Sequence, residues 1–290
     1  MERIALYLAL ITLCLTLGAS GHETFLLPIS GWANPGDVVY LPLGSGHTAA
    51  NSELPEGIVN VTVLCPSGDI VLDGQGEISG FWDIYKLSDV EAGLYTADVY
   101  HCEGSWTHFI TNPPAEGYWE HQSAEDIDFE SLNKTGWADD WYVERSYLKN
   151  CYAKAFVAVG GDVDFAPASE PIGQELEIVP LDDITTVGDG EFSFQVLFKG
   201  EPISGLDVWA TRVGDDTPVE GVTDDEGKVS LNLTDSSELS EWIVRTDTKM
   251  DPRVVEAVDL PRGPLSAEKS YVGPVYRAAL TLRSDYLAEY

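Results

Sequence analysis

Apolar and polar residues alternate with a period of two along several stretches of the chain. In residues 57–65 every second side chain is apolar, and the residues between them include Asn60 and Thr62. The same alternation recurs at residues 191–199, 229–233 and 275–283. Such alternation is typical of a β-strand with one buried face. The pattern therefore predicts an all-β chain.

The strand pattern is interrupted between Gly161 and Gln174 by a stretch rich in Pro, Ala and Gly. Each side of this break has enough residues for a two-sheet sandwich. We therefore predict two immunoglobulin-like or transthyretin-like β-sandwich domains in tandem, over residues 22–165 and 174–290.

A second unusual segment, residues 112–150, combines many carboxylates with Trp119, Trp137 and Trp141. A connection of this length inside a compact domain is usually a functional loop. The sequence predicts an acidic, Trp-rich insertion in the N-terminal domain.

The first residues read as an export signal. An apolar run from Ile4 to Leu17 is followed by small residues up to Gly21, which suits a signal-peptidase site. An uncleaved anchor is the alternative, but the run is short of the ~20 residues that span a bilayer. We expect residues 1–21 to be removed. The mature chain would then begin at His22, lie in the periplasm or outside the cell, and have no transmembrane segment.

The net charge of the chain limits the classes of partner that it is expected to bind. The sequence has 49 acidic and 16 basic residues, for a formal net charge of −33. This balance repels nucleic acid and anionic membrane surfaces. Common catalytic motifs are also missing from the sequence. His22-Glu23 does not begin a zinc-protease HExxH because Leu26 stands at the last position, and neither a nucleophile elbow nor a P-loop occurs. We expect a protein that is not an enzyme and does not bind nucleic acid.

Three cysteines remain once Cys14 is removed with the signal. An odd count in an exported protein suggests one disulfide and one leftover thiol. Cys65 and Cys102 each end a strand pattern in the same half, so we predict that they pair and that Cys151 stays reduced, although Cys102 is in phase with polar residues. Sequons mark three glycosylation candidates, namely Asn60, Asn133 and Asn232.

All five histidines lie in the N-terminal half: His22, His47, His101, His108 and His121. A histidine at the start of a mature chain can chelate one metal through its α-amine and ring Nδ1. His101 shares a face with Tyr95, Ala97 and Val99, which predicts a hydrogen-bonded core residue. His121 falls in the insertion and is unconstrained.

Several longer stretches carry a family resemblance. The segment "GQELEIVPLDDITTVGDGEFSFQVLFKGEPISGLDVWAT" from Gly173, with "HETFLLP" and "NPGDVVYLPLGSGH" upstream, resembles an exported family of unknown function formerly named NikM, which is associated with nickel and cobalt uptake. The C-terminal half also resembles transthyretin-like and carboxypeptidase-regulatory modules. The resemblance implies a metal-transport association and pairs the post-signal histidine with a Gly-His loop. This makes His22 and His47 the expected metal ligands, with His108 as a third candidate.

Two functional hypotheses follow. The first is an exported protein that binds a divalent transition metal and serves a membrane metal-transport complex. Nickel and cobalt are implied by the resemblance, but nitrogen ligands suit copper and zinc as well. The alternative is a cell-surface structural or adhesion module that binds protein or glycan partners.

Overall fold

The protein is all-β in a computed structural model that describes residues 22–46, 49, 52–111, 117–123, 141–215, 217–237, 239–249 and 271–287. Regular structure within these ranges consists of strands and short 3₁₀ turns, which include η2 (Ala166–Ser169) and η3 (Ile184–Thr186). The predicted fold class is confirmed. The signal segment, residues 1–21, lies outside the described residues.

The strands form three sheets, named here A, B and C. Sheet A has the order β1 (Glu23–Leu26), β3 (Val39–Gly46), β8 (Trp82–Leu87), β7 (Glu77–Ser79), with β4 (Ser52–Glu53) pairing β3. Sheet C is built from β12 (Leu176–Pro180), β13 (Glu191–Phe198), β14 (Glu201–Pro202) and β17 (Lys228–Asn232). Sheet B has ten strands. Eight of them follow the order β16 (Val219–Val222), β15 (Asp207–Arg212), β18 (Glu241–Lys249), β19 (Tyr271–Arg283), β11 (Trp141–Val159), β9 (Gly93–Thr111), β5 (Ile58–Leu64), β6 (Ile70–Val71). The other two are β10 (Gly117–Glu120), which pairs with β9, and β2 (Trp32–Ala33), which pairs with β11.

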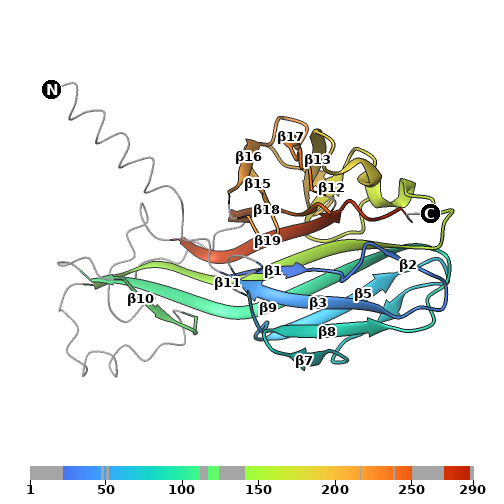
Figure 1. Cartoon of the computed structure of the whole chain (residues 1–290). Helices are drawn as coiled ribbons and strands as arrows, with labels where there is room; N and C mark the ends of the chain where they lie inside the picture. The colour runs from blue at the N-terminus through green and yellow to red at the C-terminus, as the bar shows by residue number, and fades with distance from the viewer. Residues whose placement is uncertain are drawn as a thin grey trace.

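Sheet B runs through both halves of the chain and is the layer that they share (Figure 1). The N-terminal and C-terminal parts of this sheet meet where β11 pairs in parallel with β19, from Arg145↔Tyr271 to Ala155↔Thr281. Sheet B and the core under sheet C both take residues from either side of the expected boundary at residues 161–174. The halves are not independent sandwiches in tandem, because the last strand of the chain completes the sheet begun by the N-terminal half.

The two cores lie on opposite faces of β11. Ala155 and Val157 belong to the core under sheet A, whereas Phe156 and Ala158 belong to the core under sheet C. Residues 155–159 of β11 are apolar on both faces and show no polar alternation, which explains why the sequence did not reveal this strand. The alternating strands that the sequence did predict are confirmed as β5, β13, β17 and β19, with their apolar faces in these cores.

The predicted insertion at residues 112–150 is in part strand. Residues 117–120 form β10, and residues 141–150 begin β11. β9 and β11 are each 19 residues long, and their outer ends extend beyond the sandwiches as an arm (Figure 1). Residues 112–116 and 124–140 lie outside the described residues, so the expectation of a functional loop is confined to them.

The predicted disulfide between Cys65 and Cys102 is wrong. In the antiparallel β5–β9 ladder Cys102 is opposite Ile58, whereas Cys65 follows the other end of β5, seven residues further along. At ~3.3 Å per residue the two Cα atoms are roughly 23 Å apart, far beyond the ~7 Å that a disulfide can span. Cys65, Cys102 and Cys151 are all free thiols. Both cysteines do end strand patterns, but antiparallel pairing places those ends apart.

Candidate metal-binding site

The candidate site lies where the chain enters β1. All four residues of β1 are buried, and β1 pairs with β3 in the register Glu23↔Gly46 to Leu26↔Leu43. Gly46, the residue before His47, is therefore opposite Glu23, the residue after His22. His47 itself lies outside the described residues, so its pairing with His22 stays a prediction.

His22 has defined contacts on both its backbone and its ring. Its carbonyl oxygen accepts a hydrogen bond of 2.8 Å from Nη1 of Arg277, a buried side chain of β19. Its ring Nδ1 lies 3.5 Å from Oε2 of Glu53 on β4. The two side chains are 35% and 63% exposed, so this corner of the molecule is open to solvent.

Glu23, the residue after His22, is held in the interior of the protein. Its carboxylate forms an ion pair of 2.6 Å with Nε of Arg245 on β18, and both side chains are buried. Nη1 of Arg245 also donates a hydrogen bond to Thr211 of β15. Removing one partner of a buried ion pair typically costs 3–5 kcal/mol of stability. This contact therefore strongly disfavours detachment of β1 from the rest of the protein.

Thr24 is tied to His101, whose ring is fully buried under β1. Nε2 of His101 lies 2.5 Å from the carbonyl oxygen of Glu56, which can only accept, so Nε2 carries the proton. Nδ1 then accepts from the hydroxyl of Thr24 at 2.6 Å. Burial lowers the pKa of His101 below its usual value of 6.5, although the bond to Glu56 opposes the shift. The prediction of a hydrogen-bonded core histidine is confirmed.

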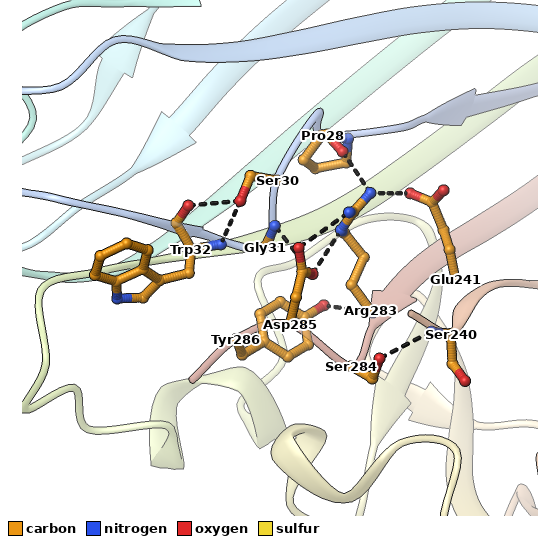
Figure 2. A network of polar contacts seen from close by, with 10 residues as sticks. All are labelled: Pro28, Ser30, Gly31, Trp32, Ser240, Glu241, Arg283, Ser284, Asp285 and Tyr286. Carbon is orange, nitrogen blue, oxygen red and sulfur yellow. Dashed lines mark hydrogen bonds and ion pairs between the residues drawn. The ribbon is translucent and has the colours of Figure 1, made fainter. Parts of the chain in front are cut away.

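A second arginine of β19 holds the segment that follows β1. Nη1 of Arg283 donates to the carbonyl of Pro28 at 2.8 Å and to Glu241 at 2.6 Å. Its Nε and Nη2 bind the two oxygens of Asp285 at 2.8 and 3.1 Å, and Asp285 also accepts from the amide of Gly31 (Figure 2). Figure 2 shows this network joining the segment after β1 to the residues at the end of β19. Residues 22–28 are therefore held at both ends by arginines of β19.

The other histidines have separate partners. Nδ1 of His108 lies 2.7 Å from Glu144, and this bond, with Arg145 beside it, lowers the pKa of Glu144 despite its partial burial. His108 lies seven residues along β9 from His101, roughly 23 Å of strand. The structure thus places His108 on the hairpin arm and does not bring it to His22. His121 stacks on Trp106, with ring centroids 4.3 Å apart.

No group of three or more His, Cys, Asp or Glu side chains within the described ranges is arranged to hold a metal ion. At the His22 ring, the described contact with another donor side chain is the one with the Glu53 carboxylate. In the same ranges no helix is long and apolar enough to cross a membrane.

Two of the glycosylation candidates can be placed. Asn60 and Asn232 are both on strands and exposed, as their sequons require. Asn133 lies outside the described residues.

Sequence reasoning missed Glu53, Arg245 and Arg277. The alternation in residues 275–283 placed Arg277 on the less apolar face of β19. Nothing in that pattern indicated that this face is buried as well. Glu53 is one carboxylate among many in an acidic chain, and only the pairing of β4 with β3 brings it to His22.

Comparison with known proteins gives one family and several distant folds. The family described as "Domain of unknown function (DUF4198)" matches residues 19–238. Comparison with curated proteins gives no match.

Three solved structures illustrate the distant likenesses. The D0–D1 domain of Intimin is 9% identical with a TM-score of 0.21, over 90% of this chain and 98% of that one. The human OSCAR ligand-binding domain is 12% identical with a TM-score of 0.21, over 91% and 100%. A two-domain fibronectin type III segment of chicken tenascin is 11% identical with a TM-score of 0.20, over 79% and 90%. At these scores the likenesses carry no argument about this chain.

Proposed function

This chain belongs to the DUF4198 family, a domain of unknown function, and we propose that it is an exported protein that binds a divalent transition metal through an N-terminal histidine. The metal is cargo rather than a catalyst, because the sequence offers none of the common catalytic motifs. The resemblance to the nickel and cobalt uptake-associated family favours those two metals and a membrane transport complex as the partner.

The observation that carries this proposal is the anchoring of His22. Chain termini usually fray unless they are tied down, but three consecutive residues are held here, by Arg277, Arg245 and His101. If cleavage follows Gly21, the new α-amine belongs to a residue whose backbone is already fixed. Pre-organisation of this kind lowers the entropic cost of binding.

The chemistry of the donors fits such a metal. An N-terminal histidine closes a six-membered chelate ring through its amine and Nδ1, and both nitrogens suit nickel, cobalt, copper and zinc. The partial exposure of the His22 ring leaves an ion accessible from solvent. An open site suits a protein that must pass its cargo on.

The test is a titration of nickel chloride into two forms of the protein. One begins at His22 with a free α-amine, and the other is extended by an acetyl group on that amine, which converts it into an amide without adding a new amine. We expect the extension to weaken binding by about 10-fold or more, because an amide nitrogen is a poor ligand at neutral pH. Equal affinity would remove the amine from the site. Absence of binding in both forms would contradict the proposal and leave the surface-module alternative.

A second test addresses the partner. A metal-uptake role predicts that expression responds to nickel or cobalt limitation and that genes for a membrane metal transporter lie beside this gene. Constitutive expression without such neighbours would contradict the transport role while leaving metal binding itself to the titration.

A further inference from the structure

We infer that the carboxylate of Glu53 is a ligand of the metal that His22 binds. This inference rests on the proposed function and adds an oxygen donor to its two nitrogens. The observation behind it is the 3.5 Å separation of His22 Nδ1 and Glu53 Oε2.

At this distance the two side chains form an ion pair that is longer than a hydrogen bond and is compatible with a shared ion. Hydrogen bonds from nitrogen to oxygen are ~2.7–3.2 Å long. Two ligands that each lie ~2.1 Å from one metal, at angles of about 90–109°, are roughly 3.0–3.4 Å apart. The observed separation is close to this range. Moreover, the nitrogen that faces Glu53 is Nδ1, the same ring atom that forms a chelate with the α-amine.

Three paired strands hold the two residues together. Glu23 of β1 is opposite Gly46 of β3, and β3 in turn pairs with β4 through Ser45↔Glu53 and Gly46↔Ser52. In the described part of the chain, the Glu53 carboxylate has no cationic side chain within ion-pair distance except His22. Its position therefore does not serve a structural ion pair with Lys or Arg.

The donor set narrows the class of ion. One amine, one imidazole and one carboxylate suit borderline divalent ions such as nickel, cobalt, zinc and Cu(II). Cu(I) prefers thiolate and thioether sulfur, and Mg²⁺ and Ca²⁺ prefer all-oxygen sites. We therefore expect the site to take divalent transition metals and to discriminate against those three ions.

The experiment is a nickel chloride titration of four proteins that begin at His22: wild type, Glu53→Gln, Glu56→Gln and the form extended by an acetyl group on the His22 amine. Glu56 is the matched control, because it is an exposed carboxylate three residues away whose described contact uses its backbone carbonyl. Glu53→Gln keeps the size of the side chain and removes its charge. The Glu53 side chain is 63% exposed, so the thermal unfolding midpoint should stay at the wild-type value.

We expect Glu53→Gln to weaken nickel binding by about 10-fold or more, since even outer-shell partners of a metal are typically worth 10–100-fold. Glu56→Gln should bind like wild type. Wild-type affinity in Glu53→Gln, with weak binding in the extended form, would overturn the role of Glu53 and leave the proposed function standing. Weak binding in Glu53→Gln with no effect of the extension would overturn the chelate instead. Equal losses of nickel affinity in Glu53→Gln and Glu56→Gln would show that Glu53 acts only through its negative charge, and this would overturn the inference.

Discussion

At the scale of single residues, the main feature is where the cations of this acidic chain lie. Of its 16 basic residues, at least five are buried, namely Lys149, Lys154, Arg245, Arg277 and Arg283. Four of the five pair with buried or half-buried carboxylates of other strands: Lys149 with Glu103, Lys154 with Glu177, Arg245 with Glu23 and Arg283 with Glu241. The sequence pattern located Arg277 and Arg283 on the less apolar face of their strand. Their burial depends on β1 and its flanking residues lying over that face, which no local pattern records.

The Arg283 network makes a prediction about stability. Arg283→Met leaves Glu241 and Asp285 without their partner, and an uncompensated buried charge typically costs 3–5 kcal/mol. We expect the free energy of unfolding, measured by urea denaturation, to fall by about that amount. The matched control is Lys228→Met, which breaks an exposed pair with Glu226 and should change little. Similar small effects in both variants would contradict the importance of the network.

His101 makes a prediction about pH. Burial lowers its pKa in the folded protein, so below about pH 6.5 the unfolded chain binds more protons than the folded one. The stability that neutral His101 contributes is present above that pH and is lost as the pH falls through the folded pKa. His101→Asn keeps an acceptor for Thr24 but cannot titrate. We expect its unfolding free energy to fall less steeply than that of wild type between pH 7 and pH 5. Parallel pH profiles would contradict this account.

At the scale of elements, β1 is the strand that matters most and the one least visible in the sequence. It is only four residues long and buried throughout, so it shows no alternation. β11 was missed for a related reason, because its residues 155–159 are apolar on both faces. β5, β13, β17 and β19 were predicted because each has one apolar face with a regular period of two. Local pattern thus finds strands with one apolar face and misses strands that are apolar on both faces; β19 was found because its second face, although buried, carries Arg277, Thr281 and Arg283.

The anchoring of β1 can be measured by hydrogen exchange. Backbone amides of residues 23–26 should exchange as slowly as those of β3, because both ends of the segment are held by arginines of β19. Arg277→Gln removes the bond to the His22 carbonyl and should speed exchange in this peptide selectively. Exchange of wild-type β1 as fast as that of the exposed strand β7 would show that the N-terminus is frayed and not pre-organised.

At the scale of the whole molecule, the halves are joined by long-range pairing. β11 and β19 are far apart in sequence, and their parallel register could not be read from either strand alone. The break at residues 161–174 lies between β11 and β12, but the sequence held no signal that sheet B and the core under sheet C both include residues from either side of it. Of the candidate site, the sequence supplied His22, and only the fold supplied Glu53 and the anchoring arginines.

The net charge of −33 has a consequence for the molecule as a whole. Self-repulsion among surface carboxylates destabilises the compact state, and salt screens it with a Debye length of ~10 Å at 0.1 M. We expect the thermal unfolding midpoint to rise by a few degrees between ~10 mM and ~500 mM sodium chloride. A midpoint that falls with salt would mean that the buried and surface ion pairs outweigh the repulsion.

Metal binding at His22 can be observed directly in an anomalous diffraction map of the mature protein, beginning at His22, crystallised with nickel chloride. We expect one nickel peak about 2.1 Å from the α-amine and Nδ1 of His22, with a Glu53 oxygen also bound. A peak only at His108 and Glu144, or none at His22, would contradict it.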